Sequence, residues 1–234
     1  MIPWLVAPSE FPPVDQALTE PNGLLAAGGS LAPEWLISAY RRGIFPWYCA
    51  GEPILWWSPD PRLVLVPSHM RISRSLRRTL QRGTFEVRFD TAFERVVGAC
   101  AEPREASGGT WITDEMRAAY IRMHELGHAH SVESWREGEL VGGLYGIALG
   151  RVFFGESMFS RMSDASKVAL AHLTRYLESR NYAVIDCQMT TRHLVSLGAQ
   201  EIPRREFCAR IEAAVREGDP PGAWPRDGTT GFVF

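Results

Sequence analysis

The chain has 234 residues, of which 45% are apolar, so it is long enough for a sizeable core and too apolar to be disordered. Its formal net charge of -2 says nothing by itself about a nucleic-acid partner. No run approaches the roughly 18 consecutive apolar residues of a membrane span, and the start "MIPWLVAPSEFPPVD" lacks the features of a signal peptide. A cytoplasmic protein with no membrane partner is therefore expected.

The cysteines indicate a reducing compartment. There are four of them, far apart and without a C-x-x-C pair, which favours free thiols over disulfides or a zinc knuckle. They are Cys49, Cys100, Cys187 and Cys208.

The first sixty residues are dense in proline, glycine and tryptophan. This composition predicts a small, loop-rich N-terminal domain over residues 1–62, followed by a larger domain over 63–234. One helix is expected in the first part, from Ala32 to Arg42. Pro33 suits its first turn and Gly43 suits a C-terminal cap.

An arginine-rich segment follows the short apolar strand "LVLVP". From Pro61 to Phe85 there are six arginines and no acidic residue. At helical spacing, Ile72, Leu76 and Leu80 form an apolar stripe, and four arginines lie on the opposite side. A single-sign stripe suits a phosphate backbone, whereas solvated faces usually mix both signs, so on this pattern alone both interpretations remain open. The four arginines are Arg71, Arg74, Arg78 and Arg82.

The rest of the chain predicts an alternation of helices and strands. A helix is expected over 113–126, then three strands within 129–159 joined by the turns "REGE" and "LGR". A helix over 164–179, the strand "YAVIDCQ" and a short helix ending at Gly198 follow. The final "TTGFVF" could add a last strand. The expected class is α+β.

The stretch "MHELGHAH" contains a literal H-E-x-x-H, which on a helix can hold zinc for a peptidase. That function requires the helix to continue through His124 and His128. Gly127 stands between them, where helices commonly end in a left-handed cap, and "AHSVESW" then alternates like a strand. We expect a structural junction and no metal, and keep the zinc peptidase as a less favoured alternative.

Three groups of segments carry a family resemblance: "PNGLLAAGGSL…AYRRGIFPW…ILWWSPDPR", "GTWIT…MHELGHAHSVE…LVGGLYGIALG…FFGESMFSRMSDASKVAL" and "IDCQ…HLVSLGAQEIPR". Together they resemble the leucyl/phenylalanyl-tRNA–protein transferases of bacteria, from about Pro21 to Phe207. The resemblance implies an aminoacyltransferase that moves Leu, Phe or Met from charged tRNA onto the α-amine of proteins beginning with Arg or Lys. The product is a degradation signal. A noncatalytic RNA-binding module is the second alternative, and a monomer is expected.

The same resemblance implies a GNAT-like C-terminal acyltransferase domain. A coenzyme A-dependent member of that fold needs a glycine-rich turn at the start of the helix after the third strand. This chain has "SRMSDASK" there, without glycine. An aminoacyl ester on RNA is therefore the expected donor, and because such an ester is already activated, no cofactor is expected.

The resemblance also implies a pocket for the aminoacyl side chain. Leu170, Leu173 and Leu177 share one helix face by spacing alone, although such a stripe is usually ordinary core. Trp47 and Trp111 are the aromatics implied to stack on the terminal adenosine, and the four arginines would contact tRNA phosphates. The implied pocket residues are Leu144, Phe153, Gly155, Met158, Leu170, Leu173, Leu177 and Ile185.

Three residues are implied to be catalytic. Asp186 and Gln188 alternate along "IDCQ", so both project to one face of the strand. The resemblance implies that Asp186 polarises Gln188, but a neutral amide is a weak base, so we expect Gln188 to align the amine. Glu156 would hold an amino group. Ile185 and Phe153 should point away from these groups in ideal strands, which predicts bulges or a partly wrong pocket.

Overall fold

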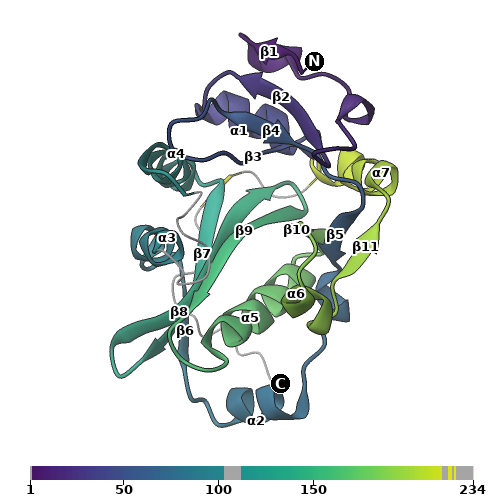
Figure 1. The fold of residues 1–234 in the computed structure, drawn as a ribbon. Helices are drawn as coiled ribbons and strands as arrows, with labels where there is room; N and C mark the ends of the chain where they lie inside the picture. Colours follow the sequence, from purple (N-terminus) through teal and green to yellow (C-terminus); the bar gives the residue numbers. More distant parts are fainter. Residues whose placement is uncertain (1, 103–111, 218–220, 223, 225–233) are drawn as a thin grey trace.

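The chain folds as two β-sheets with helices beside them (Figure 1). The computed structural model describes residues 2–102, 112–217, 221, 222, 224 and 234. Within these residues the first sheet has the strand order β1 (Trp4–Leu5), β2 (Leu24–Gly28), β4 (Leu55–Trp57) and β3 (Phe45–Pro46). The second sheet, over the same described residues, has the order β11 (Gln200–Ile202), β5 (Arg62–Leu65), β10 (Val184–Gln188), β9 (Val152–Ser160), β8 (Glu139–Leu149), β7 (Ala129–Arg136) and β6 (Glu86–Phe89).

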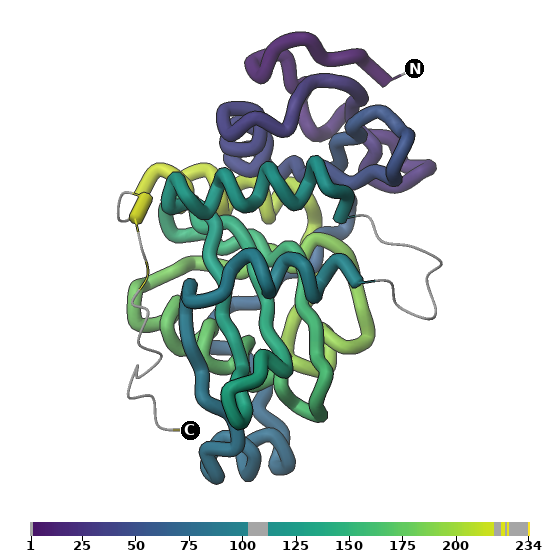
Figure 2. The backbone as a smooth tube through the Cα atoms, turned by 90° about the vertical axis from the view of Figure 1, so that its left-hand side faces the viewer, coloured from purple at the N-terminus to yellow at the C-terminus, as the bar shows by residue number. Residues whose placement is uncertain are grey.

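Helices cover both faces of the larger sheet. On one face α3 and α4 contact β7, β8 and β9, and both cross in front of the sheet in Figure 2. On the other face α5 packs against β7 and β8. The helices are α1 (Pro33–Tyr40), α2 (Arg74–Gln81), α3 (Phe93–Ala101), α4 (Asp114–Glu125), α5 (Ala165–Ser179), α6 (Arg192–Ser196) and α7 (Arg204–Ala214), with 3-10 turns at Pro8–Glu10, Val14–Gln16 and Pro67–His69.

The elements predicted from sequence periodicity are confirmed. The meander β7-β8-β9, the helix α5 and the returning strand β10 occur in the expected order, and the α+β class is confirmed with them. Helix α1 lies inside the predicted range, with Pro33 in its first turn and Gly43 in a left-handed conformation (φ 74) just after it. The segment "TTGFVF" falls mostly outside the described residues.

Several elements were not predicted. Strands β6 and β11 and helices α3 and α7 are absent from the expectations drawn from the sequence. The helix α3 had a detectable signal, because Phe93, Val96, Val97 and Cys100 recur at helical spacing and are buried. The edge strands β6 and β11 are short, and their pairing partners come from distant segments, so local pattern alone could not place them.

Two clusters of buried apolar side chains lie on the two faces of the larger sheet. The first includes Tyr40, Phe45 and Phe207, and it also contains the side chains between the small sheet and the large one. The second includes Leu144, Leu170 and their neighbours under α5. A division of the chain after residue 62 stays a prediction; β5 begins at that residue.

The pairing of β9 with β10 stops part-way, and this positions the site. The two strands are parallel neighbours only from Val184 opposite Val152 to Asp186 opposite Phe154. Beyond that point β9 continues to Ser160, paired with β8 alone, while β10 ends at Gln188. A gap therefore opens between the two strands within the sheet.

Each of these strands is irregular beside the gap. The register of β9 against β8 shifts so that Glu156 has no partner between Gly155 and Ser157. The register of β10 against β5 shifts in the same way at Cys187. An extra residue bends a strand and redirects its side chains. Phe153 and Ile185 nevertheless stay on the face of the second core cluster, whereas Glu156 bonds to Tyr40 and Tyr120 on the other face. Phe153 and Glu156 can border one space because the strands part, and not because a bulge turns them to one face.

The predicted arginine helix is present as α2, and its apolar stripe packs as expected. Leu76 is buried, and Ile72 and Leu80 pack against the second core cluster. The arginines predicted to lie opposite are exposed. Helix α2 contacts α5, and Thr79 donates a hydrogen bond to Asp164 at the start of α5 (3.3 Å). Among the described residues, no helix is both long and apolar enough to span a bilayer.

Candidate active site

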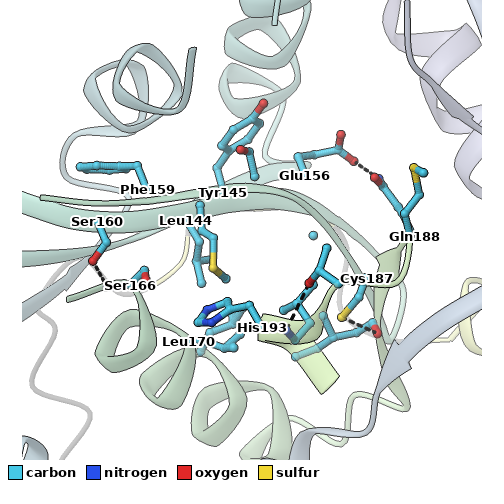
Figure 3. A pocket seen from close by; sticks show the side chains of 18 of the residues that line it. Leu144, Tyr145, Glu156, Phe159, Ser160, Ser166, Leu170, Cys187, Gln188 and His193 are labelled. Atoms are coloured by element: carbon cyan, nitrogen blue, oxygen red, sulfur yellow. Dashed lines mark hydrogen bonds between the residues drawn. The ribbon is translucent and has the colours of Figure 1, made fainter. Parts of the chain in front are cut away.

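A cavity of about 920 Å³ opens where β9 and β10 part. Because the sheet is interrupted there, residues from both of its faces line the same space. Figure 3 shows this division: Glu156, Gln188 and Tyr145 lie on one side of the strands, and Leu144, Leu170 and Cys187 lie on the other. The predicted site residues that line the cavity are Leu144, Phe153, Gly155, Met158, Leu170, Leu173, Ile185, Glu156, Gln188 and Trp47.

One wall of the cavity is apolar. Leu144 of β8, Phe153 of β9, Leu170 and Leu173 of α5 and Ile185 of β10 belong to the second core cluster and present their edges to the cavity. Such a wall can bury an apolar side chain without offering it a polar partner.

Leu177 is an exception among the predicted pocket residues. It belongs to the same cluster and shares the helix face of Leu173, but it is fully buried and does not line the cavity. It lies one turn further along α5, where the helix packs on the sheet. The shared face was correctly predicted from spacing, but spacing could not tell cavity wall from core.

The predicted stacking residues have different outcomes. Trp47 lines the cavity and keeps 38% of its surface exposed, with its ring 5.5 Å from that of Trp57. Its main-chain oxygen accepts a hydrogen bond from the indole of Trp57 (2.6 Å), which fixes the segment. Trp111 lies outside the described residues.

Glu156 is the acidic centre of the site. Tyr40 donates a hydrogen bond to its Oε1 (2.7 Å), Tyr120 donates to its Oε2 (2.6 Å), and the Gln188 amide donates to its Oε1 (3.1 Å). The dashed contact to Gln188 is visible in Figure 3. Burial disfavours the charged carboxylate and raises the pKa of Glu156 to about 7, although the two tyrosine hydroxyls oppose that shift.

Asp186 does not line the cavity. It is fully buried and forms a bidentate ion pair with Arg62 of β5, at 2.8 Å from Nε to Oδ1 and 2.6 Å from Nη2 to Oδ2. The Arg62 guanidinium lies over the rings of Phe45 (4.8 Å) and Phe207 (4.7 Å). The carboxylate therefore neutralises a cation inside the core.

The relay implied by the resemblance does not have the expected contact. The side chain of Asp186 accepts a hydrogen bond from the main-chain N–H of Gln188 (2.9 Å), while the Gln188 side chain turns to Glu156. Gln188 adopts a left-handed backbone (φ 61), which is uncommon for a residue other than glycine. Asp186 thus holds the strained end of β10 in the conformation that aims Gln188 at the cavity.

Sequence reasoning missed three residues of this site: Tyr40, Tyr120 and Arg62. The two tyrosines come from α1 and α4, and each is fully buried in the first core cluster. No short pattern marks them, since their importance depends on meeting Glu156 across 116 and 36 positions of sequence. The only general signal was that a carboxylate in an apolar strand requires hydrogen-bond donors.

The "HELGH" segment is a helix end, as predicted. Helix α4 ends at Glu125, and Gly127 adopts a left-handed backbone (φ 77). The His124 ring stacks on Phe93 and its Nδ1 lies 2.7 Å from the carbonyl oxygen of Ala129, whereas His128 lies beyond the helix. Within the part of the chain that the structure describes, no group of three or more His, Cys, Asp and Glu side chains could hold a metal ion.

The candidate site is therefore a parallel strand pair that parts over an apolar cavity, with a carboxyl and an amide group at its edge. The family pattern described as "Leucyl/phenylalanyl-tRNA protein transferase" matches residues 64–212, and the pattern for the N-terminal domain of the same family matches residues 29–60. The chain belongs to the leucyl/phenylalanyl-tRNA–protein transferase family, and it is an aminoacyltransferase.

Relatives of the chain carry the same family name over their full length. The leucyl/phenylalanyl-tRNA–protein transferase of Azoarcus sp. (strain BH72) is 71% identical over 234 residues, which is 100% of this chain and 99% of the relative. That of Aromatoleum aromaticum is 69% identical over 96% of this chain and 94% of the relative. Among solved structures, a GCN5-related N-acetyltransferase from Kribbella flavida is 12% identical, with a TM-score of 0.38 over 72% of this chain and 60% of that one.

Proposed function

We propose that this enzyme moves Leu, Phe or Met from charged tRNA to the N-terminal α-amine of proteins that begin with Arg or Lys. The observation that carries this proposal is the apolar cavity with the carboxyl group of Glu156 at its edge. An apolar side chain without a branch at Cβ, such as Leu, Phe or Met, fits such a wall, and a β-branched one is disfavoured by shape, although one methyl group yields only about 1–3 kcal/mol of discrimination.

The donor would lie across the apolar side of the cavity. Its amino-acid side chain would contact Leu144, Met158 and Leu170, and its terminal adenine would stack on Trp47, an interaction of roughly 1–3 kcal/mol per base. Trp111, outside the described residues, is proposed as the second stacking partner. The exposed Arg71, Arg74, Arg78 and Arg82, in and beside α2, would contact tRNA phosphates and set the position of the donor rather than read its sequence.

The acceptor would approach from the polar side. Its α-amine is proposed to meet Glu156 and to be aligned by Gln188, with Asp186 holding the backbone of Gln188. The product would carry a new Leu, Phe or Met at its N-terminus and would serve as a degradation signal in the cytoplasm. The enzyme is proposed to act as a monomer, with an N-terminal domain over 1–62 and a catalytic domain over 63–234.

Transfer of labelled Phe from charged tRNA to a peptide beginning with Arg tests this function directly. We expect labelled peptide, and none when the same peptide carries an acetylated α-amine. A peptide beginning with Glu should be a much poorer acceptor. If folded protein binds charged tRNA but labels no peptide, the chain is an RNA-binding module and the proposed function is wrong.

A further inference from the structure

Glu156 stands apart from the other acidic side chain of the cavity. Among the described residues that line the cavity, the acids are Glu102 and Glu156. Glu102 pairs with Arg161 at 2.5 Å, so its charge is neutralised. Within the described part of the chain, Glu156 has no ion pair, and all of its hydrogen-bond donors are neutral groups.

The hydrogen bonds around Glu156 leave room for one more proton. Tyr40, Tyr120 and the two carboxylate oxygens make three short contacts: 2.7 Å from Tyr40 to Oε1, 2.6 Å from Tyr120 to Oε2, and 2.9 Å between the two hydroxyls. Each contact needs one hydrogen, and an ionised carboxylate supplies none. In the ionised state the two hydroxyl hydrogens serve the carboxylate and leave the hydroxyl–hydroxyl contact without one; when Oε2 is protonated, it can donate to Tyr120 and Tyr120 to Tyr40, so the cluster accommodates both protonation states of Glu156.

The carboxylate also keeps an open position toward substrate. A carboxylate has about four lone-pair sites. Oε1 accepts from Tyr40 and Gln188, and Oε2 accepts from Tyr120 alone. One site on Oε2 remains, on a side chain that lines the cavity.

We propose that Glu156 accepts the proton that the acceptor ammonium group must lose, and that Tyr40 and Tyr120 are positioning residues that prepare its carboxylate for that proton. This inference rests on the proposed function. It assigns no proton transfer to Asp186, whose two oxygens are occupied by Arg62 inside the core. Gln188 aligns the amine and carries no proton.

The chemistry balances with one base. The acceptor ammonium gives a proton to Glu156 and becomes an amine, whose lone pair attacks the ester carbonyl carbon. The new N–C bond forms, and the C–O bond to the tRNA ribose breaks. A second proton of the nitrogen ends on the departing ribose oxygen. The proton held by Glu156 passes to solvent once the product has left, which restores the carboxylate.

The surroundings of Glu156 match it to this task. Burial raises its pKa to about 7, and an α-amine ordinarily has a pKa near 7.7–8.0, so the proton transfer is nearly balanced. The hydroxyls of Tyr40 and Tyr120 lower the pKa of Glu156, the charge of Asp186 raises it and the charge of Arg62 lowers it. The titratable or charged groups that face this cluster are Tyr40 of α1, Tyr120 of α4, Tyr145 of β8, Asp186 of β10, Arg62 of β5 and, next to Tyr145, Cys100 of α3.

The test is the pH profile of single-turnover transfer by the full-length enzyme with Phe-tRNA and a peptide beginning with Arg. In the Glu156→Gln variant we expect a rate about 100-fold lower and loss of the inflection that ionisation of Glu156 causes near neutral pH. Transfer by this variant with an unchanged rate and profile would overturn the inference while leaving the proposed function intact. Absence of transfer by the wild-type enzyme would remove both.

The tyrosines are tested by the position of the inflection. Tyr40→Phe and Tyr120→Phe each remove a hydroxyl that lowers the pKa of Glu156, so the inflection should move to higher pH, with most of the rate recovered above it. Tyr145→Phe is the matched control, because the Tyr145 hydroxyl is buried and has no hydrogen-bond partner among the described residues. A Tyr40 or Tyr120 variant whose rate falls equally at every pH would assign that residue a structural role only.

A spectroscopic readout needs no substrate. The ¹³C resonance of the Glu156 carboxyl carbon, assigned by its loss in Glu156→Gln, should titrate near pH 7 and shift its midpoint upward in both tyrosine variants. A midpoint near the ordinary glutamate value of 4.5, unmoved by the tyrosine substitutions, would contradict the inference whatever the transfer assay shows.

Discussion

The two sides of the cavity share the strands β9 and β10, but one side is apolar and the other is polar and hydrogen-bonded. On the side of α5, Leu144, Leu170 and Ile185 form a wall continuous with ordinary core. On the side of α4, Glu156 and Gln188 sit in a hydrogen-bonded cluster closed by buried tyrosines. The apolar wall only has to fit the shape of the side chain that it buries. The polar side requires each donor to find an acceptor, so it is the less tolerant of change.

The gap between β9 and β10 allows these two strands to build both sides of the cavity. Strict alternation would send Phe153 and Glu156 to opposite faces of a closed sheet, where no ligand could touch both. The register shifts at Glu156 and Cys187, together with the parting of β9 from β10, bring the two faces to one opening. Substitutions on either side should therefore affect different properties of the enzyme.

The largest effect on stability is expected at the buried ion pair of Asp186 and Arg62, behind the polar side of the cavity. Asp186→Ala leaves the Arg62 charge buried without its partner, which should cost roughly 3–5 kcal/mol of unfolding free energy in urea titrations. Arg62→Met combined with Asp186→Leu should recover most of that stability but not the transfer activity, because the main-chain N–H of Gln188 loses the Asp186 carboxylate that accepts its hydrogen bond. An Asp186→Ala protein as stable as the wild type would contradict the view that the polar side tolerates substitution less well than the apolar wall.

The pH dependence of stability tests the polar side further. Folded Glu156 keeps its proton up to about pH 7, whereas the unfolded chain loses it near 4.5. The folded state binds more protons in this window, so its stability should fall as pH rises from about 4.5 to about 7, by up to roughly 3 kcal/mol. Glu156→Gln should flatten the decline in urea titrations. Identical slopes for both proteins would show that Glu156 is ionised throughout.

Substitution of Gly155 and of Gly146, which pair across β9 and β8, tests how far the apolar side of the cavity extends. A Cβ at Gly155 would meet the Asp186 carbonyl oxygen at 3.4 Å and Ile185 Cγ2 at 3.9 Å, which is ordinary contact, but it would occupy the cavity. Gly155→Ala should keep the fold and raise the KM for Phe-tRNA several-fold.

Gly146 supplies the comparison for that change. A Cβ there would collide with the Phe154 carbonyl oxygen and the Phe153 ring, so Gly146→Ala should cost about 1–3 kcal/mol of stability. Thermal unfolding and steady-state transfer separate the two outcomes. Equal losses of stability in both variants would show that the cavity does not extend to Gly155.

The last prediction concerns the surface outside the cavity, where no effect on stability is expected. Arg74→Glu with Arg78→Glu should weaken tRNA binding by about tenfold or more and reduce its salt dependence by roughly two phosphate contacts. The same charge change on α7, Arg205→Glu with Arg210→Glu, is the control, since α7 lies far from α2 in Figure 1. Equal binding losses from both pairs would mean that net charge, and not the arginine stripe, attracts tRNA.

The spacing of apolar residues predicted the helices and strands that bury one apolar side against a core cluster. The stripes of α2 and α5 and the strands β7, β8 and β9 followed from spacing, and the end of α4 followed from Gly127. The residues that line the cavity were predicted mainly from the family resemblance, and that prediction wrongly included Leu177, which is buried in the core. Neither source indicated that Asp186 would bind Arg62, because that contact joins residues 124 positions apart.

The sequence by itself determined the family, the α+β class, the order of the central elements and the face on which the leucines of α5 lie. These follow from local pattern, since a helix or strand turns its apolar side inward wherever it packs. Only the tertiary structure decided which buried residues reach a cavity, that two bulges open the sheet, and that Tyr40 and Tyr120 meet Glu156. Those outcomes depend on hydrogen bonds and ion pairs between residues far apart in the sequence. A buried polar group needs such a partner, because leaving it without one costs free energy.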